Sequence, residues 1–217
     1  MDFKAHTRFT LTDRTFQNII KRDITKLAES FGFSEAEVGR INIIISEMAS
    51  NLLKHGAVAG ELLVKPFGRH NIGFEIICLD QGPGMSEPLR MQEDGVSTAG
   101  TAGEGLGAIK RQSDEFDLYS AKGVGTVILS RVYKKGHKPK LRTQKKFDVG
   151  VVMVPKNGER HCGDGWAIYE AIDYCHLLVA DGLGHGEHAE VASQGAVEAF
   201  LQNTNLTPVE QIRNLHS

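Results

Sequence analysis

Apolar residues recur at intervals of three and four between residues 41 and 52, the spacing of a helix face that packs on a core. The positions in this stripe are Ile41, Ile44, Ile45, Met48 and Leu52. Ser34, with Glu37 three residues later, has the pattern of a capping box at the start of the helix. The pattern therefore predicts a long amphipathic helix that begins after Ser34 and runs out at His55 and Gly56.

Two polar residues stand next to this apolar stripe. Glu47 and Asn51 are four residues apart, so that one lies a turn above the other on the same side of the helix. On a helical wheel the pair falls between Ile43 and the main stripe, which keeps it out of bulk water. A carboxylate and an amide without partners are costly to bury. We therefore expect a ligand or a metal ion at this position.

The pattern predicts further elements on either side of this helix. A weakly alternating strand is expected over residues 3–11, and a helix capped by Asp13 is expected from Arg14 to Gly32. Further along, the alternation and the turn residues predict strands over residues 61–67, 72–80, 115–121 and 126–133, with a short helix at residues 108–112.

The composition changes after residue 133. Residues 134–146 hold seven Lys and Arg in thirteen residues, which is typical of a basic linker; a patch for an acidic partner or a membrane surface is the alternative. Beyond it, strands are expected over residues 147–155, 164–172 and 174–182, then a helix over 187–202 and a last helix capped by Thr207. The expected organisation is a domain over 1–133, a linker over 134–146 and a second domain over 147–217.

The composition of the chain excludes several classes of function. The 217 residues carry a net charge of −2, which excludes a strong overall attraction to nucleic acid. No apolar run approaches the roughly 20 residues that span a bilayer, and no signal peptide is evident, so we expect a cytoplasmic protein. The cysteines are too few and too scattered for a disulfide framework or a zinc site, and we expect free thiols at Cys78, Cys162 and Cys175.

Three glycine-bearing segments follow the long helix. Asp80, Gly82 and Gly84 come directly after an apolar strand, where a carboxylate can accept a hydrogen bond from an exocyclic amine. The second segment precedes a helix, as in loops that present N–H groups to phosphate, and contains Gly103, Gly105 and Gly107. The third is a turn that ends in Thr126. Each segment alone also occurs in ordinary turns, and the order of the set carries the specificity.

An E-x-x-x-N helix followed by DxGxG, GxGxG and GxGT resembles the GHKL ATPase superfamily, whose nucleotide site is the Bergerat fold. The resemblance covers roughly residues 5–133 and looks most like the small bacterial anti-sigma and switch serine kinases. It implies an α+β fold, a two-layer α/β sandwich. It also implies that Asn51 holds Mg²⁺ and that Glu47 is the catalytic base. Asp80, with Gly82 and Gly84 beside it, would read adenine.

In the same resemblance, Gly103, Gly105 and Gly107 correspond to the phosphate loop, and Thr126 lies near the adenine. Residues 85–102 would form a mobile lid over the nucleotide.

The segment after the linker resembles the opening of a metal-dependent phosphatase of the PPM class, in its bacterial sporulation and stress branch. The GD and DGxGxG motifs of that class fall on residues 163–165 and 181–186. They place Asp164, Asp181 and the Gly182 carbonyl at metal-ligand positions, for Mg²⁺ or Mn²⁺. The chain ends about seventy residues into that fold, so we expect a partial α/β/β/α domain and doubt its competence as a phosphatase.

The first hypothesis is thus an ATP- and Mg²⁺-dependent serine/threonine protein kinase of bacterial stress or sporulation signalling. Its substrate would be an antagonist protein of the STAS type or an anti-sigma partner, with no nucleic acid or membrane involved and a homodimer left open. The alternatives are a binding module switched by nucleotide without chemistry, and an ATP-sensing regulator of a phosphatase completed outside this chain.

Overall fold

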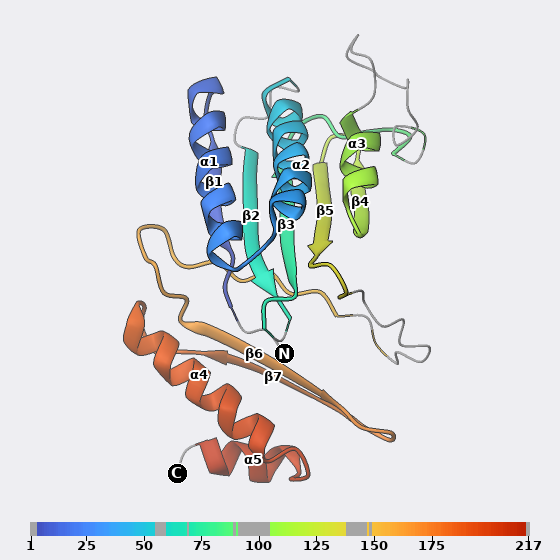
Figure 1. Ribbon diagram of the computed structural model, residues 1–217. Coiled ribbons are helices and arrows are strands. Elements are labelled where there is room, and N and C mark those ends of the chain that lie inside the picture. Colours follow the sequence, from blue (N-terminus) through green and yellow to red (C-terminus); the bar gives the residue numbers. More distant parts are fainter. Residues whose placement is uncertain are drawn as a thin grey trace. The chain divides into compact units, whose positions relative to one another are not determined.

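The computed structural model describes residues 4–54, 60–68, 70–88, 90, 105–137, 147 and 149–215. The chain divides into two compact units (Figure 1). The larger unit spans residues 7–147, and the smaller unit combines residues 1–6 with residues 148–217.

The larger unit is an antiparallel five-stranded sheet with three helices on one of its faces (Figure 1). Its strand order is β1-β2-β3-β5-β4. In chain order the elements are β1 (Thr7–Leu11), α1 (Arg14–Ser30), α2 (Glu35–Lys54), β2 (Gly60–Phe67), β3 (Gly73–Asp80), α3 (Gly105–Gln112), β4 (Glu115–Ala121) and β5 (Gly125–Tyr133). The expected α+β two-layer architecture is therefore confirmed for this unit.

The helix starts follow the predicted capping chemistry. Asp13 Oδ1 accepts the N–H groups of Thr15 (2.7 Å) and Phe16 (3.3 Å) at the start of α1. At the start of α2, Glu37 Oε2 accepts the Ser34 N–H (2.7 Å), and Ser34 Oγ accepts the Glu37 N–H (3.4 Å). This reciprocal pair is the predicted capping box, and it satisfies two N–H groups that a helix end leaves without partners.

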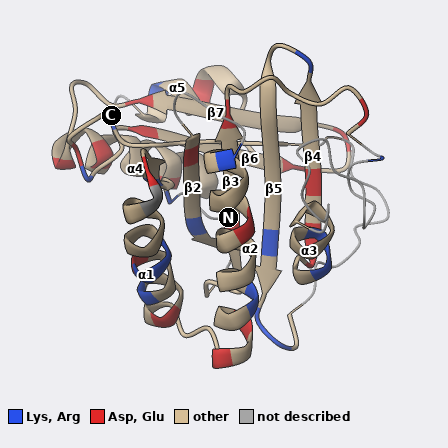
Figure 2. Ribbon diagram, turned by 90° about the horizontal axis from the view of Figure 1, so that it is seen from above, with Lys and Arg blue, Asp and Glu red and all other residues tan. Residues whose placement is uncertain are grey.

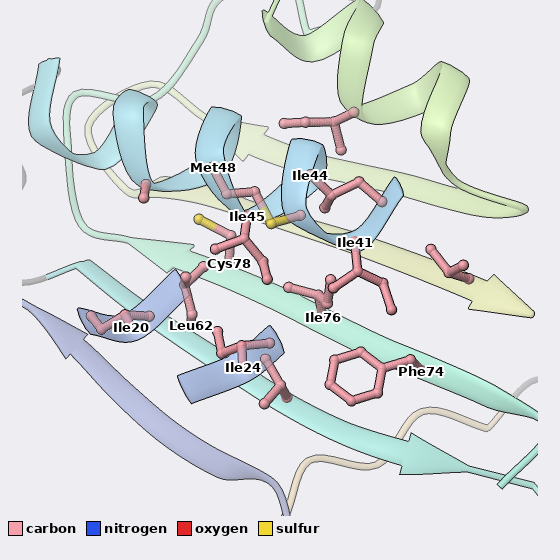
Figure 3. Close-up of a cluster of buried hydrophobic side chains, with 14 of the residues drawn as sticks. Ile20, Ile24, Ile41, Ile44, Ile45, Met48, Leu62, Phe74, Ile76 and Cys78 are labelled. Carbon is pink, nitrogen blue, oxygen red and sulfur yellow. The ribbon is translucent and has the colours of Figure 1, made fainter. Parts of the chain in front are cut away.

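The predicted apolar stripe of α2 forms the centre of the core. Ile41, Ile44, Ile45, Met48 and Leu52 are all buried. They belong to one cluster with the helix-facing residues of the sheet, among them Phe74, Ile76 and Cys78 of β3 (Figure 3). Burying side chains of this size stabilises a fold by about 1.5–3 kcal/mol each. This packing fixes α2 along the sheet.

The C-terminal half of α2 lies at the Asp80 end of β3. A Cβ on Gly60, at the start of β2, would lie 2.6 Å from Leu52 Cδ2. The next residue of β2, Glu61, pairs with Leu79 of β3. The end of α2, the start of β2 and the end of β3 therefore meet at one end of the sandwich, as Figure 3 also shows for Met48 and Cys78.

The start of an element differs from the sequence prediction by three or more residues in two places of the larger unit. β1 begins at Thr7, whereas the alternation predicted a strand from residue 3. α3 begins at Gly105, whereas a helix was predicted only from residue 108. The glycines of residues 103–107 were interpreted as loop, yet Gly105 and Gly107 form the first turn of α3 because that turn packs closely on α2.

The smaller unit is a two-stranded antiparallel sheet with two helices. β6 (Asp164–Glu170) and β7 (Cys175–Asp181) pair directly, and α4 (Glu187–Gln202) and α5 (Pro208–Leu215) follow. Thr207 and Glu210 form a capping box at the start of α5, as the predicted Thr207 cap requires. The core of this unit is small, with Ala167, Val197 and Phe200 buried together.

The predicted strand over residues 147–155 is wrong. The described residues of this run are irregular, and both Val149 and Val152 are exposed. The backbone partner of Met153 is His6, whose N–H donates to the Met153 carbonyl (2.7 Å). Gly150 and Pro155 disfavour a strand within an apolar run, and no neighbouring strand supplies a ladder among the described residues.

Charged residues of both signs occur throughout the described part of the chain. Seen from above, acidic and basic residues are interspersed over the helices and strands (Figure 2). None of the described helices is long and apolar enough to cross a membrane.

Candidate functional site

Glu47 and Asn51 lie half-buried on one side of α2, between its buried stripe and the exposed Ile43. Their backbones are held in the helix. Within the described part of the chain, neither side chain makes a hydrogen bond or an ion pair. A carboxylate and an amide at the edge of a core are thus left with free lone pairs, which suits them for a ligand.

The first residue of α3 packs directly against this pair. A Cβ on Gly105 would lie 3.0 Å from Glu47 Oε2 and 3.5 Å from Asn51 Oδ1. Any side chain at Gly105 would therefore crowd both groups. The N-terminus of α3, whose first N–H groups have no partner within the helix, lies beside the Glu47 carboxylate and the Asn51 amide. The structure thus places Gly105, from the predicted phosphate-binding segment, next to Glu47 and Asn51 of the long helix.

Asp80 closes β3 on the helix-covered face of the sheet, two residues beyond the buried Cys78. Its Oδ1 accepts the Gly82 N–H (2.8 Å), which leaves its other carboxylate oxygen without a partner among the described residues. In the sheet, Asp80 stands opposite Thr126 of β5. Because the C-terminal half of α2 lies at this same end, the predicted adenine-side residues and the Glu47–Asn51 pair share one end of the sandwich.

Two glycines allow the loop after β3 to contact the β4–β5 turn. Gly84 has φ +67°, and a Cβ there would lie 2.0 Å from the Ala121 carbonyl oxygen. Gly125 has φ +129°, and its Cβ would lie 2.1 Å from the Asp80 carbonyl oxygen. No side chain fits either position. In the structure, position 84 therefore requires glycine because the backbone there lies so close to the Ala121 carbonyl.

A hydroxyl network that sequence reasoning missed ties these segments together. Ser120 Oγ accepts the Met85 N–H (2.8 Å) and lies 3.0 Å from Thr126 Oγ1. Thr126 itself is buried. The available signal was the hairpin register, which places Ser120 opposite Thr126 once the β4–β5 turn is located. The network fixes the Thr126 hydroxyl next to the end of β3.

Other predicted site residues lie within α3, against the core or outside the described residues. Gly107 is buried within α3. Gly103 lies outside the described residues, as does most of the predicted lid. Met85, the first lid residue, packs against the core of the larger unit.

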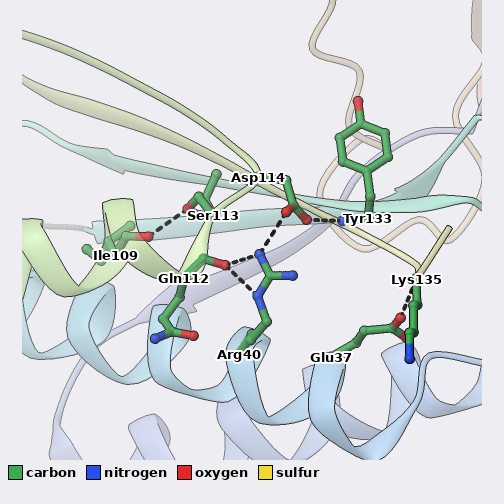
Figure 4. A network of polar contacts seen from close by, with 9 residues as sticks. Glu37, Arg40, Ile109, Gln112, Ser113, Asp114, Tyr133 and Lys135 are labelled. Carbon is green, nitrogen blue, oxygen red and sulfur yellow. Dashed lines mark hydrogen bonds and ion pairs between the residues drawn. The ribbon is translucent and has the colours of Figure 1, made fainter. Parts of the chain in front are cut away.

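A second polar network, also missed from the sequence, joins the other end of α3 to α2 (Figure 4). Arg40 Nε and Nη2 donate to the carbonyl of Gln112, the last residue of α3, at 2.9 and 2.6 Å. Arg40 Nη2 also pairs with Asp114 Oδ1 at 3.1 Å. Asp114 Oδ2 in turn accepts the Tyr133 N–H at 2.7 Å. Arg40 therefore links α2, α3 and the edge of the sheet.

Cys78, two residues before Asp80, has a thiol of low reactivity. Burial, followed by the nearby Asp80 charge, raises the pKa of the Cys78 thiol well above its usual range. A thiol of raised pKa is a poor nucleophile at neutral pH. Cys78, Cys162 and Cys175 are all free, and Cys78 packs as part of the core, as the sequence predicted.

In the smaller unit, the predicted metal-ligand residues lie at one end of the hairpin. Asp164 and Asp181 are exposed and directly opposite each other in the β6–β7 register, where Cβ atoms are about 4.5–5.5 Å apart. The Gly182 N–H donates to the Gly163 carbonyl (2.9 Å). Among the described residues, no group of three or more His, Cys, Asp or Glu side chains could hold a metal. Two carboxylates alone make an incomplete ligand set.

Comparison with known proteins decides the family of the larger unit. Residues 9–131, more than half of the chain, match the family described as "Histidine kinase-like ATPase domain". The chain belongs to the histidine kinase-like ATPase domain family. This confirms the expected resemblance at the level of the ATPase domain, and the match ends before the segment predicted to resemble a phosphatase.

Individual proteins to which the chain is similar include one curated relative and several solved structures. The chain is similar to the serine/threonine-protein kinase RsbT of Bacillus subtilis (strain 168), with 38% identity over 102 residues, which is 47% of this chain and 77% of RsbT. Among solved structures, the mycobacterial sensor histidine kinase MprB has a TM-score of 0.38 at 15% identity, covering 59% of this chain and 97% of that one. The histidine kinase domain from Erythrobacter litoralis EL346 has a TM-score of 0.37 at 16% identity, covering 57% and 64% respectively.

Proposed function

We propose that this protein is an ATP- and Mg²⁺-dependent serine/threonine protein kinase. The observation that carries the proposal is the contact of Gly105, at the start of α3, with Glu47 and Asn51. A helix N-terminus favours phosphate, because its free N–H groups and its dipole attract negative charge. Beside it stand the Glu47 carboxylate and the Asn51 amide, which have no partner among the described residues. The similarity to the kinase RsbT supports the same function.

The donor set of the larger unit fits Mg²⁺. This ion takes oxygen ligands and keeps several waters, so the Asn51 amide oxygen and the phosphates of ATP suffice to hold it. When bound, the ion neutralises charge on the phosphates. Glu47 accepts the proton of the serine or threonine hydroxyl as that oxygen forms its bond to the γ-phosphorus and ADP departs.

The adenine end of the site is assigned to the loop after β3 and the start of β5. The free oxygen of Asp80 accepts a hydrogen bond from the exocyclic amine, and Thr126 lies opposite in the register. Gly82 and Gly84 lie in the loop beside the base. Gly103, Gly105 and Gly107 belong to the phosphate-binding segment.

The protein substrate is assigned by resemblance. We propose an antagonist protein of the STAS type or an anti-sigma partner in a bacterial stress or sporulation pathway. This follows from the likeness to anti-sigma and switch kinases, of which the 38% identity to RsbT is the support at hand.

Calorimetry of ATP–Mg²⁺ binding tests the site. Asn51→Ala and Asp80→Asn should each weaken binding at least about tenfold, the equivalent of ~1.4 kcal/mol, through lost metal or adenine contacts. Asn18→Ala is the matched control, since Asn18 is an exposed asparagine of α1. Binding that survives both site variants would contradict the assignment.

Phosphoryl transfer is tested separately with Glu47→Gln, which keeps the shape of the side chain but removes the base. Transfer to a STAS-type acceptor should fall by 10²–10⁴-fold, the usual contribution of a general base. ATP affinity should stay close to wild type. If wild type binds ATP and partner affinity responds to it, but no phosphoprotein forms, the protein is a nucleotide-switched binding module.

For the smaller unit we propose divalent-cation binding by Asp164, Asp181 and the Gly182 carbonyl, on the ground that the two carboxylates face each other across the hairpin. Because the described residues hold no group of three or more such ligands, the proposal is limited to cation binding and does not extend to phosphatase activity. Titration with Mn²⁺ should show weak binding that Asp164→Asn removes. Equal binding by that variant would contradict the assignment.

A further inference from the structure

Three polar residues of α2 lie on one side of the helix. Glu47 and Asn51 follow Arg40 by roughly two and three turns, so all three face the same direction. Glu47 and Asn51 contact the first residue of α3, and Arg40 binds its last residue. Both ends of α3 are therefore set by one row of side chains on α2.

The Arg40 contact is well formed. The Arg40 side chain is only 30% exposed, and its guanidinium gives two donors to one carbonyl, at 2.9 and 2.6 Å. The Gln112 carbonyl is among the last four of α3, which have no partner within the helix. A cation at a helix C-terminus also complements the negative end of the helix dipole. Asp114, fixed by the Tyr133 N–H, holds the guanidinium in place.

α3 depends on such contacts for its position. It has eight residues, and helices this short are not stable alone in water. Leu106 and Ile109 bury its apolar side in the core, but the burial of apolar surface is not directional. The Arg40 fork adds a directional constraint at the far end. A tilt about the core contacts would move Gly105 away from Glu47 and Asn51.

We propose that Arg40 is a positioning residue for the phosphate-binding end of the site. It holds the C-terminus of α3 and thereby sets the N-terminus beside Glu47 and Asn51. The inference rests on the proposed nucleotide function. Arg40 acts on affinity for the phosphates and leaves adenine recognition at Asp80 unchanged, because Asp80 is held by β3 and the Gly82 N–H.

The test compares ATP–Mg²⁺ with adenosine, which lacks phosphates. In Arg40→Ala the affinity for ATP–Mg²⁺ should fall about tenfold, the equivalent of ~1.4 kcal/mol. Adenosine affinity, measured by competition, should stay within about twofold of the wild-type value. This change is much smaller than the tenfold loss, ~1.4 kcal/mol, expected for ATP–Mg²⁺. Arg40→Lys keeps the charge for Asp114 but lacks the planar fork, so ATP affinity should lie between those of wild type and Arg40→Ala.

Arg22→Ala serves as the control, since its side chain is 62% exposed on α1 and pairs with the adjacent Asp23. Equal losses for ATP and adenosine in Arg40→Ala, or no loss for ATP, would overturn the inference and leave the proposed function standing. If Arg40→Ala does not fold, the ratio of the two affinities in Arg40→Lys decides in the same way. Absence of ATP binding in wild type would overturn the proposed function and this inference together.

Discussion

At the scale of single residues, the site depends on two backbone approaches that only glycine permits. Gly125 places its backbone against the Asp80 carbonyl, and Gly84 does the same against Ala121. The Gly125 contact holds the end of β3 against the start of β5, and the Gly84 contact holds the loop after β3 against the end of β4. The position of the Asp80 carboxylate is thus set by residues that have no side chain.

Substitution of Gly125 tests this dependence. Gly125→Ala adds a Cβ 2.1 Å from the Asp80 carbonyl oxygen at φ +129°, so the strand ends must separate. We expect the free energy of unfolding, measured with urea, to fall by at least about 1–3 kcal/mol, the cost of an unfavourable backbone conformation alone. ATP affinity should also fall, because Asp80 moves with its backbone.

Gly123→Ala is the matched control within the same turn. Gly123 also has a positive φ of +78°, but a Cβ there meets nothing within 4 Å. It should therefore show the backbone strain without the loss of ATP affinity. Similar ATP affinities for the two variants would show that the Gly125 approach does not position Asp80.

At the scale of elements, Glu37 connects the start of α2 to the chain after β5. Its Oε2 accepts the Ser34 N–H, and its Oε1 accepts the Lys135 N–H at 2.6 Å. Burial raises the pKa of Glu37, but the N–H donors of Ser34 and Lys135 outweigh this effect, so the net pKa lies below its usual value. The same carboxylate thus stabilises both the start of α2 and the position of the backbone at Lys135.

The lowered pKa predicts a pH dependence with a definite sign. A carboxylate with a depressed pKa in the folded state adds stability above its unfolded pKa of about 4.3, and this is lost as the pH falls through the folded value. Glu37→Gln should therefore cost about 1–3 kcal/mol at pH 7, as one N–H loses its acceptor. The gap to wild type should shrink below about pH 4.

Urea unfolding at a series of pH values measures this gap. Glu35→Gln is the control, because Glu35 lies exposed in the same first turn of α2. It removes the same charge near the helix N-terminus without removing a hydrogen bond that the structure shows. A gap for Glu37→Gln that is independent of pH would contradict an ionised role.

Local patterns gave most elements and missed the contacts between them. The apolar period located α2, and Asp13 and Ser34 marked helix starts, because capping is encoded within a few residues. Arg40 could not be found in this way, since its partner Gln112 is far along the chain and accepts through its backbone. The predicted strand at 147–155 failed because an apolar run does not specify a pairing partner.

At the scale of the whole molecule, the two units differ in the size of their cores. The larger unit has a core of many residues from three helices and the sheet. Among the described residues of the smaller unit, the hydrophobic cluster consists of Ala167, Val197 and Phe200, and Leu177 and Val179 are exposed on β7. A two-stranded sheet has marginal stability. We therefore expect the smaller unit to unfold first.

The linker predicted at residues 134–146 stays a prediction, but its first residues are bound to the larger unit. The Lys134 ammonium donates to the Phe31 carbonyl (2.6 Å) and lies 4.9 Å from the centre of the Phe33 ring. Residues 138–146 lie outside the described residues. If they link two separately folding units, brief trypsin treatment should cut there first, since the run is rich in Lys and Arg.

Trp166 makes the independence of the two units measurable. It is the one tryptophan of the sequence and lies in β6, so its fluorescence reports on the smaller unit alone. Phe200→Ala removes the largest side chain of that small core, a change that typically costs about 3–5 kcal/mol. We expect the Trp166 transition to shift to much lower urea, or the signal to be that of an unfolded chain in buffer.

ATP–Mg²⁺ affinity should stay unchanged in Phe200→Ala, because the residues proposed to bind ATP all belong to the larger unit. Val191→Ala, at an exposed position of the same helix, should change neither signal. A loss of ATP affinity in Phe200→Ala alone would instead show that the folded smaller unit supports the nucleotide site, and the two units would then have to be treated as one functional body.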